Sequence, residues 1–163
     1  MKNLLSVIIV CLSIFSNSIN AATPSMKIED TVVKMAIADG VSFDDAIGSM
    51  KLRANEHNMK LVAELPLSEQ VKSMGKKSRR MGIYQFCDAL MAQSMVEANI
   101  NFAAYLPCRI ALVEDKKGKG WLLMMNLDIM LKGATLNKKL KKNATKVRDV
   151  LMDIMQAGAN GDL

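Results

Sequence analysis

The sequence predicts an α+β fold, in which a mostly antiparallel sheet carries two main helices on one face. One observation is a hairpin pattern in residues 105–130, where two apolar runs flank the charged turn Asp115-Lys116-Lys117-Gly118-Lys119. The other is the order of predicted elements: strand, helix, two strands, short helix, hairpin, long helix. Strands and helices that do not alternate strictly are typical of α+β domains.

Length and composition limit the chain to a single domain. It has 163 residues, of which 50% are hydrophobic, so it can bury a core of ordinary size. Aromatic residues make up only 4%, whereas methionine occurs fourteen times. Flexible methionine side chains fill irregular gaps, and most of them are expected to be core residues.

The predicted first strand and first helix follow one another directly. Residues 31–38 form the strand, which ends at the turn dipeptide Asp39-Gly40. Ser42 is the expected N-cap of a helix that runs to about Asn58, with Asp45 in a capping-box position.

Two further strands and a short helix come next. Residues 59–65 form the second strand, which Pro66 ends because proline has no backbone donor. Residues 82–87 form the third strand, and Asp88 is the expected cap of the short helix after it.

Residues 67–80 are rich in lysine and arginine. We interpret this segment as a solvated loop; the alternative is a contact with an anion or a membrane surface. The segment contains no aromatic residue that could stack on bases, so nucleic acid is not an expected partner.

The returning strand and a long helix complete the predicted fold. The strand begins near Trp121 and becomes polar towards Asp128, and residues 136–154 form an amphipathic helix that ends near Gly158. The basic face of this helix is expected to be solvated. The domain is expected to span residues 31–158, followed by a frayed tail at residues 159–163.

The first 22 residues have the layout of a cleavable secretory signal. A short positive start precedes a twelve-residue apolar run that contains Cys11, and the segment ends near Ala21 and Ala22. A run of this length is too short to span a bilayer, so no transmembrane segment is expected after cleavage. We therefore expect a periplasmic or secreted protein with an N-terminal extension at residues 23–30.

The mature chain keeps two cysteines, and they are the main chemical feature of the sequence. Cys87 ends the third predicted strand and Cys108 begins the fourth, so antiparallel pairing places them at one edge of the sheet. Because exported proteins retain disulfides, a structural bond between these cysteines is our first expectation.

Three other interpretations of the pair remain open. Redox or persulfide chemistry is one, since Arg109 next to Cys108 could lower a thiol pKa. Ligation of a soft metal or haem is another, with Met91 or Met95 on the short helix as additional ligands, because thiolates and thioethers favour monovalent copper. Two buried, inert thiols are the third. The sequence requires no particular cofactor.

No catalytic motif accompanies these residues. The chain has no Gly-x-Ser-x-Gly, no His-Glu-x-x-His and no phosphate-binding loop. His57 is the single histidine and is expected to be a solvated residue near the end of the first helix. An enzymatic function is therefore not the favoured hypothesis.

The segment Leu106-Pro107-Cys108-Arg109-Ile110-Ala111-Leu112-Val113-Glu114-Asp115, with Gly118-Lys119 and Trp121 after it, resembles the domain-of-unknown-function 302 family, also called TT-1751-like. The resemblance covers about residues 32–156. It implies a curved antiparallel sheet gripping a long helix, similar to the TATA-box-binding-protein fold, commonly paired as a homodimer. The function of the family is not settled, so the resemblance implies a fold rather than a reaction.

This chain departs from the family pattern at the positions of both cysteines. Phe86-Cys87-Asp88 stands where a Gly-Asn-Pro-like turn is usual, and Cys108 replaces an aliphatic residue. Our leading hypothesis is an exported domain that binds a small ligand or a protein, with a structural or redox-responsive cysteine pair. The alternatives are a periplasmic thiol or sulfur redox protein, and a copper or haem carrier.

Overall fold

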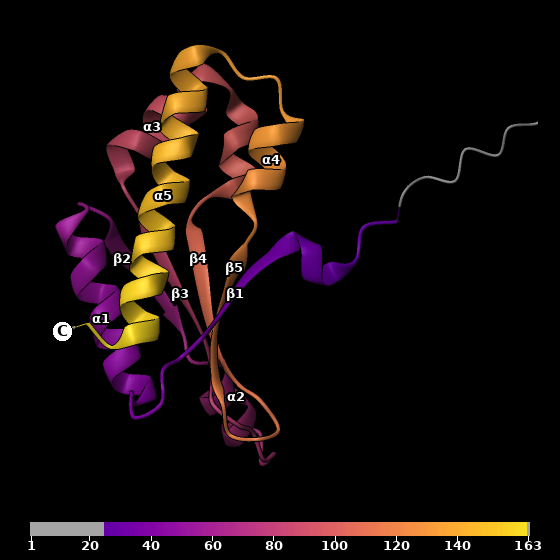
Figure 1. The fold of residues 1–163 in the computed structure, drawn as a ribbon, viewed down its shortest axis with the longest axis vertical. Coiled ribbons are helices and arrows are strands. Elements are labelled where there is room, and N and C mark those ends of the chain that lie inside the picture. Colours follow the sequence, from indigo (N-terminus) through magenta and orange to yellow (C-terminus); the bar gives the residue numbers. More distant parts are fainter. Residues whose placement is uncertain (1–24, 163) are drawn as a thin grey trace, which may run out of the picture.

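The computed structural model describes residues 25–162, so the predicted signal peptide lies outside the described residues. Its centre is an open five-stranded sheet in the order β1-β5-β4-β3-β2, and every neighbouring pair is antiparallel (Figure 1). The strands are β1 (Val32–Ala36), β2 (Lys60–Leu65), β3 (Met81–Cys87), β4 (Cys108–Glu114) and β5 (Gly120–Met125). The predicted α+β class is confirmed.

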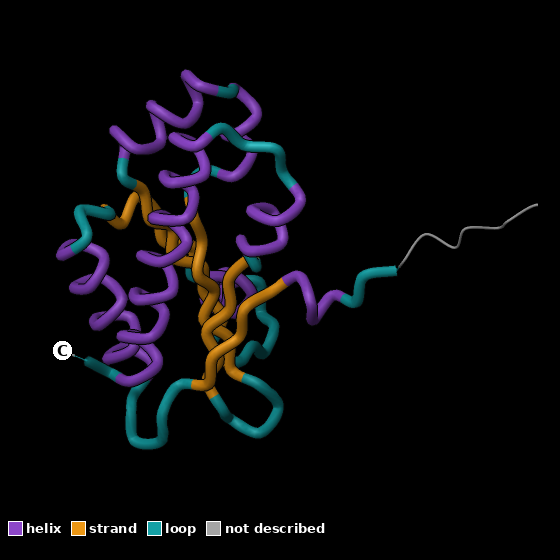
Figure 2. Tube along the Cα trace, turned by 45° about the horizontal axis from the view of Figure 1, so that its top comes forward, coloured by secondary structure: helices purple, strands orange, loops and turns teal. Residues whose placement is uncertain are grey.

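Two long helices cover one face of this sheet. Figures 1 and 2 show α1 and α5 lying side by side along the strands. The α-helices are α1 (Phe43–Glu56), α2 (Leu67–Ser73), α3 (Ala89–Ala98), α4 (Leu127–Gly133) and α5 (Lys138–Asn160); the 3-10 helices are η1 (Ile28–Thr31) and η2 (Ile100–Tyr105). No helix among residues 25–162 is long and apolar enough to cross a membrane.

Side chains alternate between the two faces of the sheet, as the strand period requires. One set is buried against α1 and α5: Tyr84, Phe86, Ile110, Leu112, Leu122 and Met124. Their neighbours along the strands are half-buried on the opposite face: Ile83, Ala111, Val113, Trp121 and Leu123. The core therefore lies on the helix side, and the other side keeps an apolar, partly exposed surface.

The caps predicted for the first and third helices are present. The Ser42 hydroxyl accepts a hydrogen bond from the backbone N–H of Asp45 at 3.0 Å and donates one to its carboxylate at 2.7 Å. Asp88 accepts from the backbone N–H groups of Leu90 and Met91, at 3.1 Å and 3.0 Å. These bonds satisfy helix donors that would otherwise lack partners.

The segment at residues 67–80 is not wholly a loop. It contains the helix α2, in which Leu67 and Val71 are half-buried one helical turn apart while Ser68 is only 2% exposed. The density of positive charge obscures this short apolar pair in the sequence.

The returning strand is shorter than the sequence pattern indicates, because β5 ends at Met125. The Asn126 side chain accepts a hydrogen bond from the backbone N–H of Asp128 at 3.1 Å and so caps α4. A local side-chain cap therefore converts the end of the predicted strand into a helix.

The long helix continues to Asn160, two residues beyond its predicted end near Gly158. Ala159 lies in the predicted frayed tail, yet it is only 3% exposed, and its carbonyl accepts a 2.8 Å hydrogen bond from the backbone N–H of Ala38. The residue that ends the helix is Gly161, which has a φ of 72°.

The turn between β4 and β5 is held by one carboxylate. Asp115 accepts from the backbone N–H groups of Lys117 and Lys119, at 2.7 Å and 3.0 Å, and from the indole N–H of Trp121 at 2.9 Å. The Trp121 hydrogen bond, followed by that from Lys117, holds the pKa of Asp115 below its ordinary value. The resulting contact between the turn and the returning strand fixes the hairpin.

Candidate functional site

The strands β4 and β5 pair along only part of their length. They pair from Glu114 and Gly120 at the turn as far as Ala111 and Leu123. Beyond this point β4 continues along β3 and β5 continues along β1, so the two strands separate towards α4 (Figure 1). The sheet therefore opens between its central strand, β4, and β5.

A crevice of about 390 Å³ lies at this opening. Its walls come from both separating strands, from β1 and β3 beside them, from the segment before β4, and from η1, α4 and α5. They are mainly apolar: Thr31, Val32, Ile83, Tyr105, Pro107, Cys108, Arg109, Ala111, Leu123, Met124, Met125, Leu127 and Leu151. Clefts of this volume with apolar walls are typical of small-molecule sites.

A second, smaller cavity of about 50 Å³ adjoins the crevice. Tyr105, Cys108 and Leu127 line both spaces. The small cavity is lined by six sulfur-bearing residues: Met59, Cys87, Met91, Met95, Cys108 and Met130. We call this space the sulfur pocket.

The predicted disulfide is absent, because both cysteines of the described chain are free. The strand register supplies the physical reason. Cys108 pairs with Phe86 rather than with Cys87, so the two cysteines are offset by one residue. Successive side chains of a strand point to opposite faces, and this offset therefore opposes a direct bond.

The two thiols are also less acidic than the sequence suggested. Burial raises the pKa of Cys108 to about 11. Burial also raises the pKa of Cys87, and the negative charge of Asp88 raises it further. Arg109 does not offset these effects, because its side chain is exposed. It follows Cys108 in β4, where its partner in the strand register is Gln85. The raised pKa values give no support to the expected activation of a thiol by Arg109.

The structure brings the two predicted methionines to the cysteines. Asp88 caps α3 directly after Cys87, and the four-residue spacing of Met91 and Met95 puts both on the side of the helix that faces the sulfur pocket. Met95 is 7% exposed. Arg109 belongs to the wall of the crevice and not to the sulfur pocket.

Two of the sulfur-bearing residues of the sulfur pocket are not among the site residues that the sequence predicts. Met59 precedes β2 and is 4% exposed, and Met130 belongs to α4. Both are far along the chain from the cysteines, and α4 itself was read as part of a strand. No local spacing pattern links them to the pair, so only the fold reveals them.

His57 lies at the end of α1 and lines neither cavity. Its Nε2 is 2.6 Å from one carboxylate oxygen of Asp153 on α5, and an Arg53 nitrogen lies 2.9 Å from the other. The hydrogen bond from His57, and then that from Arg53, hold the pKa of Asp153 below its ordinary value. This cluster links the two long helices on the surface.

The comparisons with known proteins identify the family. A family model with the description "Domain of unknown function DUF302" matches residues 33–158. The chain therefore belongs to the DUF302 family. The crystal structure of an uncharacterized conserved DUF302 protein from Bacillus stearothermophilus is similar, with a TM-score of 0.66 and 13% identity over 78% of this chain and 97% of that chain. At this identity the likeness supports the fold alone. The comparison with curated proteins gives no match.

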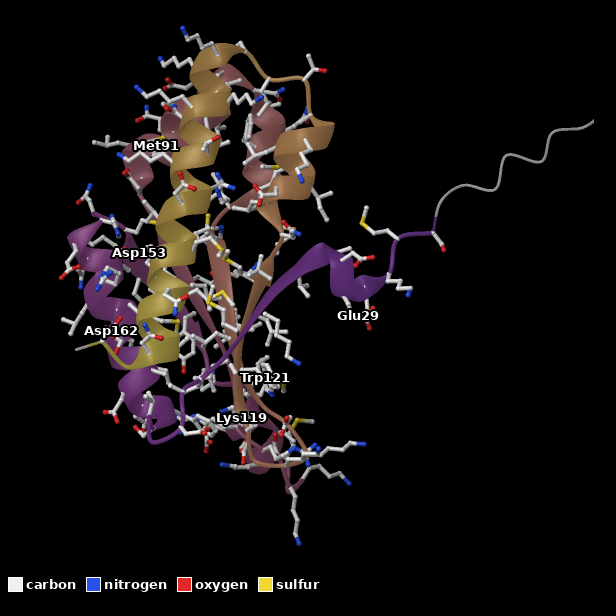
Figure 3. All side chains as sticks on the ribbon, in the orientation of Figure 1. Glu29, Met91, Lys119, Trp121, Asp153 and Asp162 are labelled. Carbon is white, nitrogen blue, oxygen red and sulfur yellow. The ribbon has the colours of Figure 1, made fainter. Side chains whose placement is uncertain are left out.

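In this DUF302 domain the residues that carry the family resemblance lie at both ends of β4. Pro107 and Cys108 belong to the crevice, whereas Asp115 and Trp121 secure the turn at the far end. Figure 3 shows Trp121 and Lys119 near the turn, and Met91 towards the opposite end of the molecule. The second half of the motif therefore stabilises the hairpin and does not contact the site.

Proposed function

We propose that this DUF302 domain is an exported, non-enzymatic protein that binds a small amphipathic anion in the crevice between β4 and β5. The observation that carries the proposal is a single arginine beside apolar walls. Arg109 lines the crevice, is exposed, and makes no ion pair within residues 25–162. A ligand with an apolar body and a carboxylate or sulfonate group matches this arrangement.

The walls of the crevice favour an apolar ligand body. Ile83, Ala111 and Leu123 form part of the half-buried face of the sheet, and Met124 and Leu151 extend the lining towards the core. Transfer of apolar ligand surface from water to these side chains is favourable. The guanidinium of Arg109 would then fix the orientation of the ligand by pairing with its charged group.

A displacement titration tests this function. The fluorescent anion 1-anilinonaphthalene-8-sulfonate serves as the probe, and decanoate as the competitor. We expect one probe per chain, and we expect Arg109→Gln to weaken both ligands by roughly tenfold, because a charged hydrogen-bond partner is lost. The matched control is Arg79→Gln, which removes an exposed arginine that does not line the crevice.

Equal binding by the Arg109→Gln variant and the wild-type protein would overturn the assignment of Arg109. A wild-type protein that binds neither anion would overturn the proposed function itself. Because Arg109 is exposed, its replacement is expected to leave the fold intact, which circular dichroism can verify.

Thiol redox chemistry has less support than ligand binding. The thiolate is the reactive form of cysteine, and burial raises the pKa of both thiols. At neutral pH the two groups are therefore mainly protonated. A slow reaction of both thiols with a disulfide reagent, compared with free cysteine, is the result that this environment predicts.

The proposal includes two expectations about the setting of the domain. Export to the periplasm or outside the cell rests on the signal-like residues 1–22, and pairing into a homodimer rests on the family resemblance. The half-buried apolar face with Val113, Trp121 and Leu123 supports a pairing surface. Sedimentation of the mature chain should show twice the monomer mass, and Val113→Glu should reduce it to the monomer.

A further inference from the structure

The sulfur pocket collects an unusual set of side chains from separate parts of the fold. Its cysteines come from the end of β3 and the start of β4, and its methionines come from α3, α4 and the residue before β2. Six sulfur-bearing residues thus line a cavity of about 50 Å³. Core methionines elsewhere, such as Met50 and Met155, lie outside this pocket.

We propose that the sulfur pocket is a binding site for one monovalent copper ion, with Cys108, Met91 and Met95 as its ligands. Thiolate and thioether sulfur are soft ligands that favour this ion over hard cations. The site would make the domain a carrier or buffer of copper in addition to its role in binding an amphipathic anion.

The size and lining of the pocket select against other groups. A cavity of about 50 Å³ can hold an ion or a few water molecules, and it is too small for a haem macrocycle. Within residues 25–162 there is no group of three or more His, Cys, Asp and Glu residues that could hold a metal. A zinc site built from the usual ligands is therefore not available in the described part of the chain.

The one carboxylate at the pocket is already engaged. Asp88 lines the cavity, but its Oδ1 accepts hydrogen bonds from the backbone N–H groups of Leu90 and Met91, at 3.1 Å and 3.0 Å. This cap fixes the start of α3 and thereby the positions of Met91 and Met95. Asp88 therefore acts as a positioning residue for the two methionines.

The fold also provides an entry path. Cys108 lines both the sulfur pocket and the larger crevice that opens on the sheet. Cys108 is thus the one sulfur-bearing residue that the two spaces share. Deep burial of Met59 and Met95, which are 4% and 7% exposed, shields the bound ion from water.

The charges of the complex suit an apolar site. One monovalent copper ion and one thiolate have no net charge together, and thioethers add ligands without adding charge. A neutral complex avoids the large cost of burying an unpaired charge. The Cys108 thiol releases its proton to solvent when it becomes a ligand, so the charge balance is complete without an oxidant or reductant.

An anaerobic titration of the reduced mature domain tests the site. The protein competes for copper with the chromophoric chelator bicinchoninate, and the bound stoichiometry and affinity follow from the absorbance. We expect one ion per chain. We expect Cys108→Ser, and separately the double variant Met91→Leu with Met95→Leu, to weaken binding by at least about tenfold.

A matched control separates ligand loss from core damage. Met50→Leu with Met155→Leu makes the same chemical change at two fully buried methionines outside the sulfur pocket. Leucine has nearly the volume of methionine, so both double variants should fold. We expect the control to bind copper like the wild-type protein. X-ray absorption of the loaded wild-type protein should show only sulfur neighbours.

Three results would overturn the proposal. They are a wild-type protein that loses all copper to the chelator, equal affinity in the pocket variants and the control, and nitrogen or oxygen neighbours in the absorption spectrum. The outcome is independent of the anion test, because Met91 and Met95 line the sulfur pocket only. The Met91→Leu, Met95→Leu variant should still bind 1-anilinonaphthalene-8-sulfonate.

Discussion

Asp115 shows how one residue can explain a sequence motif that looks functional. Its carboxylate joins the β4–β5 turn to Trp121 through three hydrogen bonds. Lys119, at the end of the same turn, forms a salt bridge of 2.6 Å with Asp39. This contact ties the turn to the segment that follows β1. The Asp, Lys and Trp positions of the resemblance therefore act in folding.

Removal of the Asp115 carboxylate should loosen the hairpin. We expect Asp115→Ala to lower the urea midpoint of unfolding and to shift the fluorescence of Trp121, because the indole N–H loses its acceptor. Trp121 is the single tryptophan of the sequence, so the signal reports this position directly. An unchanged emission spectrum and midpoint would contradict the structural role of the carboxylate.

A second residue-scale prediction concerns acid stability. His57 and Arg53 hold the pKa of Asp153 below its ordinary value, so this carboxylate stabilises the folded state above the unfolded pKa of about 3.9. The contribution is lost as the pH falls through the lower folded pKa. We expect Asp153→Asn to lower stability at pH 7 and to unfold with acid less steeply than the wild-type protein.

Urea midpoints of the two proteins between pH 7 and pH 2.5 measure this difference. The gap between them should close as the wild-type carboxylate takes up its proton. A gap that stays constant over the whole range would show that the charge of Asp153 contributes nothing to stability.

At the scale of elements, the contact between α1 and α5 depends on a glycine. A side chain on Gly158 would overlap the side chain of Met50 and come within 3.0 Å of the Ala46 carbonyl oxygen. The sequence pattern suggested that Gly158 ends the helix, whereas it allows the close approach of two helices. Sequence alone does not distinguish these two uses of glycine.

Gly158→Ala should therefore destabilise the domain although alanine favours helices. Overpacking in a core costs about 1–3 kcal/mol, which exceeds the gain in helix propensity of about 1 kcal/mol. The control is Gly133→Ala at the end of α4, where a Cβ would meet no atom within 4 Å. Chemical denaturation measures both. Equal effects of the two substitutions would contradict the close-approach role.

Whether the sequence predicts a helix or its cap depends on the strength of the local sequence signal. The caps at Ser42 and Asp88 were predictable because each uses a side-chain bond within three residues. The helices α2 and α4 were not predicted, because seven-residue helices offer too few apolar positions to define a period. Their effect on the site is large, since α4 supplies Met130 to the sulfur pocket.

At the scale of the whole molecule, the sequence predicted the fold class and the position of the cysteines at one end of the sheet. It did not predict the crevice, which exists because β4 and β5 each follow a different neighbour beyond Ala111 and Leu123. Strand separation depends on the packing of every layer. The predicted disulfide failed for a related reason, since a one-residue offset in register decides which face a side chain occupies.

The two adjoining cavities give the two proposals different residues. Arg109 and the apolar walls of the crevice are the residues proposed to bind an amphipathic anion, and the sulfur side chains of the smaller cavity are those proposed to bind a soft metal. Both spaces lie away from the β4–β5 turn, which the Asp115 and Trp121 contact stabilises. The domain therefore keeps its folding contacts at one end and its candidate binding residues towards the other.

The central claim is that the crevice between β4 and β5 is the ligand site, and methyl NMR tests it most directly. Decanoate is titrated into protein labelled at its alanine, leucine and methionine methyl groups. We predict that the largest shifts fall on Ala111, Leu123 and Met125, which line the crevice, while those of Ala46 and Ala54 on α1 stay constant. Shifts centred on α1, or none at saturating decanoate, would contradict the account.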